Sequence, residues 1–148
     1  MASPFQELSR IFGEQHVDHR GVLRFVNDFF LDEVKRFYIV HQISTKVVRA
    51  WQAHMKEKKH FFVLSGSFLV GMVKIDNWKH PSVDLKVHRE LLRAEDNCIL
   101  VIPPGFANGF RALKEESSLL VFSTATLQES KLDDYRYDKQ LWMDWSVV

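Results

Sequence analysis

The 148-residue sequence lacks several features that would each point to a particular class of protein. Its single cysteine, Cys98, cannot form a disulfide within the chain, so a reducing compartment such as the cytoplasm is expected. No stretch approaches the roughly 18 apolar residues of a membrane span, and the first residues have no apolar segment of a secretion signal. Twenty Lys and Arg against 19 Asp and Glu give a net charge of +1, which provides no overall field to attract nucleic acid. With no repeat, linker or low-complexity run, we expect a single domain.

What the sequence does contain is a series of short runs rich in Val, Ile, Phe and Tyr, separated by polar turn signals such as Ser65-Gly66. Evenly spaced short strands of this kind predict a β-sandwich or barrel. Helix is expected only at the ends, around residues 4–12 and in one or two turns near 132–141. The predicted strands are residues 34–43, 47–51, 60–64, 68–75, 85–91, 98–102 and 119–124.

A known spacing for metal sites in β-barrels fits this chain, but the chemistry of the residues does not. The pattern is His-x-His, then Glu, then Gly, and a last His after a Pro-x-Gly turn. Here Gln52 and His54 occupy the His-x-His, Lys59 stands where the Glu would be, and Asn108 replaces the last His. One imidazole, two amides and an ammonium make a poor site for a transition metal. We therefore expect a metal-free site that needs no cofactor.

Three segments resemble the dTDP-4-dehydrorhamnose 3,5-epimerases. Residues 102–110, Ile-Pro-Pro-Gly-Phe-Ala-Asn-Gly-Phe, resemble the signature Ile-Pro-x-Gly-Phe-Ala-His-Gly-Phe of that family. Residues 18–23 match its Asp-x-Arg-Gly motif, and residues 143–145 match its terminal Ile-Asp-Trp. Residues 35–38 and 49–54 are closer to the related sugar-nucleotide 3,4-ketoisomerases, with Lys-Arg-x-Tyr followed by Arg-Gly-x-His-Ala-His.

The resemblance implies an all-β, cupin-type double-stranded β-helix, a jelly-roll barrel with short terminal helices and a ligand cavity at its mouth. It implies one domain over residues 1–148, with a core of about residues 18–145. The expected partner is a small-molecule nucleotide sugar, most simply a dTDP-sugar, and neither nucleic acid nor a membrane. A homodimer is also expected, because the long strand at residues 34–43 would otherwise leave an unpaired sheet edge.

The departures from the family bear on the reaction. In the 3,5-epimerases the proton-abstracting His falls at Gln52, which cannot act as a base, and the catalytic Tyr falls where residues 125–127 are Ala-Thr-Leu. The Asp that partners that His would lie beyond Val148, so we expect it to be lacking. Ordinary 3,5-epimerisation is therefore not expected. Of the two histidines of the 3,4-ketoisomerases, the second survives as His54, and their Tyr is present as Tyr38.

A 4-keto sugar has acidic hydrogens on the carbons beside the carbonyl, and removing one creates an enolate. That chemistry needs a base that titrates near neutrality, a donor at the oxyanion and a proton donor. His54 could supply the base, because an imidazole has an unperturbed pKa near 6.5. Arg49 or Lys59 could stabilise the oxyanion, and Tyr38 could donate the proton. His54 and Tyr38 are thus the candidate catalytic residues.

Five side chains are candidates for binding the substrate: Arg20, Arg49, Gln52, Lys59 and Asn108. Arg20 would hold the pyrophosphate, because a guanidinium can bind phosphate with two hydrogen bonds. Gln52 and His54 share one face of a regular strand, whereas Arg49 and His54 lie on opposite faces. Arg49 would therefore reach the same cavity only through a bulge or a neighbouring turn.

The predicted function is that of a metal-independent isomerase or epimerase acting on a nucleotide-linked 4-keto-6-deoxy sugar through an enolate. The alternative is a cupin that binds a sugar or nucleotide sugar without turnover, because fold does not fix function. A metal-dependent dioxygenase is disfavoured by the missing ligands. Simpler interpretations stay open as well: His54 as a hydrogen-bonded interior residue, Tyr38 as a core aromatic, and Lys56 and Lys58 in a solvated turn with Glu57.

Overall fold

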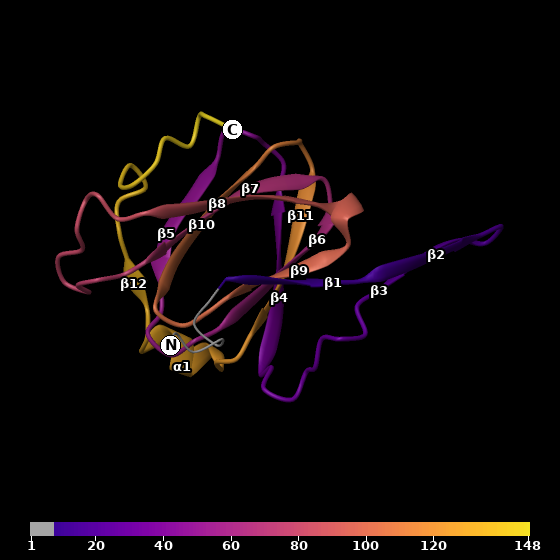
Figure 1. Cartoon of the computed structure of the whole chain (residues 1–148), viewed down its shortest axis with the longest axis horizontal. Helices are drawn as coiled ribbons and strands as arrows, with labels where there is room; N and C mark the ends of the chain where they lie inside the picture. The colour runs from indigo at the N-terminus through magenta and orange to yellow at the C-terminus, as the bar shows by residue number, and fades with distance from the viewer. Residues whose placement is uncertain (1–7) are drawn as a thin grey trace.

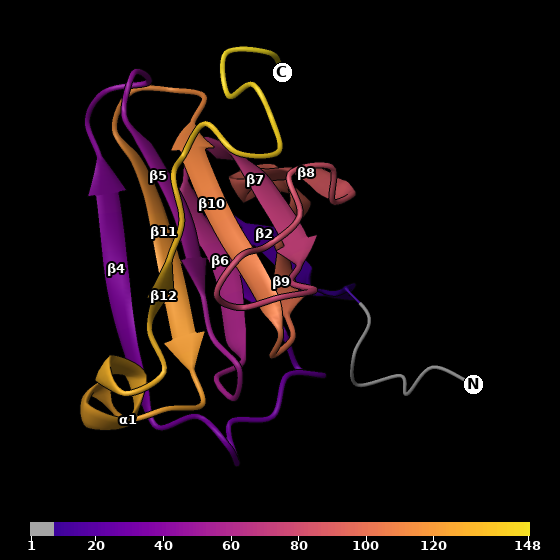
Figure 2. The same ribbon diagram turned by 90° about the vertical axis from the view of Figure 1, so that its left-hand side faces the viewer.

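The computed structural model describes residues 8–148, in which two five-stranded antiparallel sheets face each other. Figures 1 and 2 show these sheets enclosing a barrel, and Figure 1 shows the β2–β3 hairpin projecting away from it. The first sheet has the order β1–β9–β6–β11–β4 and the second has the order β12–β5–β10–β7–β8. The strands of the first sheet are β1 (Ser9–Phe12), β4 (Arg36–Gln42), β6 (Lys59–Ser65), β9 (Cys98–Ile102) and β11 (Ser117–Ser123). Those of the second are β5 (Val48–Ala53), β7 (Ser67–Lys74), β8 (Val87–Arg93), β10 (Phe106–Ala112) and β12 (Tyr135–Arg136), and the hairpin consists of β2 (Glu14–Asp18) and β3 (Gly21–Phe25).

This architecture confirms the predicted all-β barrel, and the seven predicted strands fall on seven observed ones. Of the two helix predictions, the N-terminal one is wrong within the described residues, and the C-terminal helix exists but lies earlier in the chain than predicted. Residues 9–12 form β1, which pairs with β9, while residues 1–7 lie outside the described range. The helix α1 (Leu127–Lys131) precedes the predicted segment, because Thr126 and Glu129 form a capping box that starts it there.

Strand β10 was not predicted, because its residues belong to the segment interpreted as a turn motif. It lies between β5 and β7 at the centre of the second sheet, and most of it is buried. Gly109 permits this position: a Cβ atom there would lie 2.5 Å from Cβ of Ala50 and 2.8 Å from Cζ2 of Trp145. The glycine of the sequence motif thus allows β5 and the C-terminal segment to pack closely on β10.

The hydrophobic core has two parts, one inside the barrel and one on the outer side of the second sheet. Inside, the ring of Phe110 meets those of Phe61 and Phe68 edge to face. On the outer side, the C-terminal segment covers the sheet, and the indole of Trp51 donates a hydrogen bond to the backbone oxygen of Leu141 at 3.0 Å. The residues resembling the terminal Ile-Asp-Trp of the family therefore close the second core cluster. Within residues 8–148 there is no helix with the length and apolar character needed to cross a membrane.

His60 is a buried histidine on the face of β6 opposite to Lys59. Its ring centroid lies 4.9 Å from that of Phe29, and the side chain is only 4% exposed. Burial, reinforced by the positive charge of Lys58, lowers the pKa of His60 to about 4. The neutral imidazole is therefore the form that the folded chain accommodates.

We expect this histidine to make the fold sensitive to acid. Because the pKa of His60 is lower in the folded chain than in the unfolded one, the unfolded chain binds more protons as the pH falls from 6.5 to 4. Between pH 7 and pH 5 this should remove about 1 to 2 kcal/mol from the free energy of unfolding. In His60→Phe, which keeps a ring but cannot titrate, urea unfolding should show a smaller loss over the same range. An equal loss in both proteins would contradict this assignment.

Candidate functional site

A cavity of about 320 Å³ lies between the two sheets, a volume suited to a small molecule. Its wall combines aromatic side chains with several cationic and amide groups. Strands β4, β5, β6 and β10 contribute most of the wall, and the segment at β12 contributes the rest. The lining residues are Tyr38, Val40, Val48, Arg49, Ala50, Trp51, Gln52, Lys59, Phe61, Asn108, Phe110, Arg136 and Tyr137.

A second hollow, of about 400 Å³, lies against the C-terminal segment and is larger than the first. Its titratable side chains, Lys139 and Asp144, are both exposed, and Asp144 accepts hydrogen bonds from Ser146 in its own turn. Five polar residues named from the sequence line the cavity between the sheets instead. We therefore place the candidate site there.

A β-bulge in β5 brings Arg49 and Gln52 to the same cavity. On β10 their partners Phe110 and Asn108 are two positions apart, whereas Arg49 and Gln52 are three apart, and the register shifts between the two pairs. The extra residue on β5 reverses the alternation of side chains. Arg49 thus joins Gln52 through a bulge, which was one of the two routes the sequence allowed.

Tyr38 reaches the cavity from β4, where side chains alternate between the barrel interior and the outer surface. The guanidinium carbon of Arg36 lies 5.0 Å from the centroid of its ring. Burial, with a contribution from the negative charge of Glu57, raises the pKa of Tyr38 to about 12. At neutral pH the phenol is therefore protonated and can donate a hydrogen bond into the cavity.

Gln52 is held in a chain of hydrogen bonds that fixes its amide. The Lys59 ammonium donates to its side-chain oxygen at 2.9 Å, and its own amide nitrogen donates to Asp134 at 3.1 Å. The amide of Asn108 donates to the backbone oxygen of Gln52 at 3.2 Å. Asn108 therefore lines the cavity and also ties β10 to β5.

Lys59 starts β6, and its side chain points into the barrel rather than to solvent. The residue is 3% exposed, and burial lowers the pKa of its amine from 10.5 to about 8, although the negative charge of Glu57 opposes the shift. A neutral amine is thus available to an appreciable fraction of molecules at ordinary pH. This property was not evident from the sequence, which placed Lys59 beside two solvated lysines.

His54 lies just beyond β5, and its imidazole is absent from the cavity lining. The ring is buried, its Nδ1 donates to the backbone oxygen of Asp133, and its Nε2 lies 3.7 Å from Oε2 of Glu57. Burial and the positive charge of Lys59 lower the pKa of His54. The sequence predicted this imidazole on the cavity face, whereas the structure turns it towards Glu57. The regular alternation ends with β5, and the backbone of His54 binds the Gly105 amide of the Pro-Pro-Gly turn instead.

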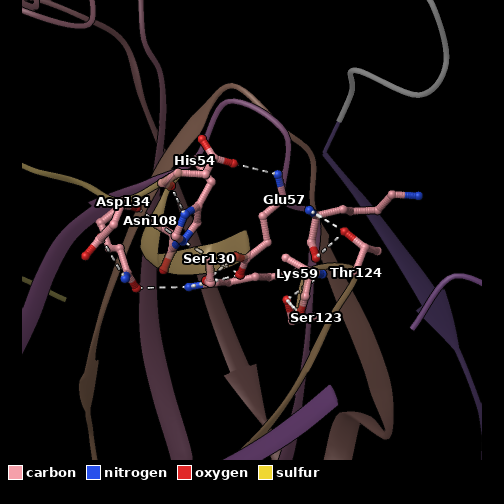
Figure 3. A network of polar contacts seen from close by, with 12 residues as sticks. His54, Glu57, Lys59, Asn108, Ser123, Thr124, Ser130 and Asp134 are labelled. Carbon is pink, nitrogen blue, oxygen red and sulfur yellow. Dashed lines mark hydrogen bonds and ion pairs between the residues drawn. The ribbon is translucent and has the colours of Figure 1, made fainter. Parts of the chain in front are cut away.

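Glu57 is buried between His54 and Lys59, which corrects its interpretation as part of a solvated turn. Ser130 of α1 donates to one carboxylate oxygen, and the other lies 3.7 Å from the imidazole and 3.9 Å from the Lys59 ammonium. Figure 3 shows these four residues in one polar network beside the cavity. The neighbouring Lys58 is half-buried and pairs with Glu33.

Arg20 lies on the β2–β3 turn, away from the cavity of its own chain. Its guanidinium binds Asp18 at 2.6 Å and is largely exposed. Five of the residues named from the sequence therefore line the cavity: Tyr38, Arg49, Gln52, Lys59 and Asn108. Arg20 and the ring of His54 do not line it. Among residues 8–148, no three His, Cys, Asp or Glu side chains form a group suited to a metal ion.

The segment from residue 130 to 137 supplies site residues that the sequence did not indicate. Arg136 and Tyr137 line the cavity, Asp134 holds Gln52, and Ser130 and Asp133 hold the Glu57 loop. No motif or spacing marked these residues, and part of the segment was predicted as helix. The pairing of β12 with β5 brings Arg136 to the site, and hydrogen bonds to Glu57 hold Ser130 and Asp133 there.

A jelly-roll barrel with an inner cavity lined by cationic and aromatic residues is a cupin fold of the RmlC type. The family model described as dTDP-4-dehydrorhamnose 3,5-epimerase matches residues 4–148. The chain therefore belongs to the dTDP-4-dehydrorhamnose 3,5-epimerase family, a family of sugar-nucleotide isomerases and epimerases.

Solved structures at 17–21% identity share the fold. The RmlC epimerase of Mycobacterium tuberculosis is 21% identical with a TM-score of 0.75, over 95% of this chain and 75% of that one. The QdtA 3,4-ketoisomerase of Thermoanaerobacterium thermosaccharolyticum, in complex with TDP, is 19% identical with a TM-score of 0.71, over 88% of each chain. The dTDP-4-dehydrorhamnose 3,5-epimerase of Bacillus anthracis, with TDP and PPi bound, is 17% identical with a TM-score of 0.74, over 100% of this chain and 90% of that one. A search of curated protein sequences found no match.

Asp133 should be the residue that holds the loop between β5 and β6 against the site. Its carboxylate accepts the backbone N–H groups of Met55, Lys56 and Glu57 at 2.7, 2.9 and 3.1 Å. Asp133→Ala would remove three hydrogen bonds, of which the one from Glu57 is partly buried, and we expect thermal unfolding to show a loss of about 1 to 3 kcal/mol. Asp138→Ala is the control, because that carboxylate accepts one N–H in an exposed turn. Equal losses in the two variants would argue against the role of Asp133.

Proposed function

We propose that this protein isomerises or epimerises a dTDP-linked 4-keto-6-deoxy sugar by moving a proton at a carbon beside the ketone. Family membership supports the substrate class. Among the solved structures of the same fold, an RmlC from Legionella pneumophila is described in complex with dTDP-4-keto-L-rhamnose, and a QdtA variant in complex with TDP-4-keto-6-deoxyglucose. The proposal requires neither a metal nor another cofactor.

The single observation that carries the proposal is the composition of the cavity wall. It combines a buried amine, two guanidiniums and a protonated phenol with aromatic walls. An enolate is an anion, and the buried Lys59 and half-buried Tyr38 can stabilise it more strongly than water does, because the dielectric around them is low. Arg49 and Arg136 are exposed, and Arg136 also pairs with Asp134 at 2.9 Å. Such a wall favours the transition state of proton abstraction over the neutral ketone.

Each lining residue has a proposed role in that reaction. Arg49 and Arg136 bind the pyrophosphate or the enolate oxygen, and Tyr38 donates a hydrogen bond to the developing charge. Gln52 and Asn108 hold sugar hydroxyls, because their amides are fixed by the network. Arg20 is not among the residues of its own chain that line this cavity.

The reaction can be tested in deuterated water with dTDP-4-keto-6-deoxyglucose as substrate. Proton abstraction should introduce deuterium at C3 or C5, which NMR or mass spectrometry detects. Saturable binding without deuterium uptake would instead support a binding protein without turnover. Separating the products by chromatography then distinguishes a 3-keto product from a C3 or C5 epimer.

We also propose that the protein is a cytoplasmic homodimer formed through the free edge of β4. This strand ends the first sheet, and every second side chain points away from the barrel. Phe37 and Ile39 are 65% and 55% exposed, and Ile43 beyond the strand is 66% exposed. An unpaired edge with apolar side chains is unfavourable in water, and pairing with a second copy would cover it.

If the protein is a dimer formed through β4, a charge on that strand should change its mass in solution, and a charge elsewhere should not. Ile39→Glu places a charge on the β4 surface and should convert the dimer to a monomer in light scattering at micromolar concentration. Val83→Glu changes a residue that is 75% exposed in the β7–β8 loop, and its mass should stay that of the wild type. A monomeric wild type would remove the proposal, and so would a dimer that withstands Ile39→Glu.

A further inference from the structure

We propose that Lys59 is the catalytic base of the cavity, a role the sequence had suggested for His54. This inference rests on the proposed function and names the residue that moves the proton. The neutral amine takes the hydrogen from the carbon beside the ketone: the C–H bond breaks, an N–H bond forms, and the electron pair enters the enolate. The resulting ammonium returns the proton to carbon, so the cycle consumes no other reactant.

The first argument is that the other titratable groups of the described cavity wall cannot exchange a proton near neutrality. The guanidiniums of Arg49 and Arg136 remain charged at any ordinary pH. The phenol of Tyr38 has its pKa raised to about 12, and the hydroxyl of Tyr137 donates to the backbone oxygen of Trp78 at 2.7 Å. Lys59 remains, with a pKa of about 8.

The second argument is the position of the amine. Its Nζ atom lies 2.9 Å from the side-chain oxygen of Gln52, and both residues line the cavity. A lysine ammonium has three donors and needs no more than one of them for Gln52. The neutral amine can donate to Gln52 and keep its lone pair for a ligand. The hydrogen bond to Gln52 therefore orients Lys59 and leaves the lone pair of its amine free for a ligand.

The third argument is that the charged groups around the amine of Lys59 oppose one another in their effect on its pKa. Glu57, from the loop before β6, and Asp134, before β12, raise the pKa of Lys59, while Arg36 of β4 and Arg136 of β12 lower it. These charges oppose one another, so burial has the largest effect and favours the uncharged amine. The carboxylate of Glu57, 3.9 Å away, can stabilise the ammonium that forms during the reaction.

His54 occupies a different place in the same network. Its Nε2 faces Glu57 at 3.7 Å, and its Nδ1–H is committed to the backbone of Asp133. A ligand in the cavity would contact Lys59 and Gln52, which stand in the wall, and not the imidazole. We therefore assign His54 a positioning role, in which its Nδ1–H holds the backbone of Asp133, whose carboxylate fastens the loop that carries Glu57.

Two substitutions of Lys59 separate proton transfer from the stabilisation of charge. Lys59→Met removes both, whereas Lys59→Arg keeps a cation that cannot act as a base. If Lys59 is the base, both variants should lose about 10²- to 10⁴-fold in the rate of deuterium uptake. If it only stabilises the enolate, the Arg variant should retain the exchange rate within about tenfold. That result would overturn the proposal.

Lys58→Met is the matched control, because Lys58 is the adjacent lysine and pairs with Glu33 outside the cavity. It should exchange deuterium at the rate of the wild type. Calorimetric titration with TDP and a thermal melt on each variant test whether the cavity is still formed. A Lys59 variant that binds TDP but does not exchange has lost chemistry rather than structure.

The pH dependence of the wild type gives a second test, which does not depend on any variant folding. With Lys59 as the base, the exchange rate should rise with pH and reach half of its maximum near pH 8, where the amine loses its proton. A half-maximum at or below pH 6.5 would assign the base to a histidine and overturn the proposal. Absence of exchange at every pH would instead contradict the proposed function itself, so the two failures are distinguishable.

Discussion

The burial of Glu57 and Lys59 side by side is the constraint on which the site depends. Both side chains are almost fully enclosed, and an ion removed from water is costly unless other groups compensate it. In this protein each of the two side chains forms a hydrogen bond with a residue of another element. The hydroxyl of Ser130 in helix α1 donates to the Glu57 carboxylate, and the side-chain oxygen of Gln52 in β5 accepts from the Lys59 ammonium.

This arrangement explains why so many polar groups meet at one end of an otherwise apolar barrel. The loop that carries Glu57 is fastened by Asp133, and Asp134 of the same segment fixes the amide that contacts Lys59. The contacts of Asp133, Ser130 and Asp134 join residues 73 to 82 positions apart in the chain. The buried charges are therefore held by tertiary structure rather than by local sequence. Within this network Oε2 of Glu57 makes no hydrogen bond, and the ammonium of Lys59 and the imidazole of His54 face it at 3.9 and 3.7 Å.

The sequence was sufficient for the barrel because its signal is local. Runs of β-branched and other apolar residues marked strands such as β9, and the sequence named Gln52 and Asn108 for one site, where the structure pairs them across β5 and β10. Strand β10 was missed because a motif rich in turn residues hides a strand that is buried on both faces. The capping box at Thr126 was a readable local signal, and it would have placed α1 correctly.

The site was only partly predictable, for three physical reasons. The alternation of side chains along a strand does not indicate that an extra residue in β5 brings Arg49 into the cavity. It also does not indicate that the strand ends before His54. Glu57 looked like a surface residue because its neighbours in sequence are lysines, whereas its neighbours in space are Ser130 and His54. Arg136 follows no pattern and reaches the wall through a two-residue strand that pairs at the edge of the sheet.

The pairing of the C-terminal segment with β5 also determines when the site can exist. Arg136 and Tyr137 complete the cavity wall, and Leu141 binds the indole of Trp51 behind it. During synthesis the chain leaves the ribosome from its N-terminal end. The β-strands up to β11 can therefore collapse into a barrel while Glu57 still lacks Ser130 and Asp133. A chain stalled before residue 130 would therefore hold the Glu57 carboxylate without the hydroxyl of Ser130, and its loop without the carboxylate of Asp133.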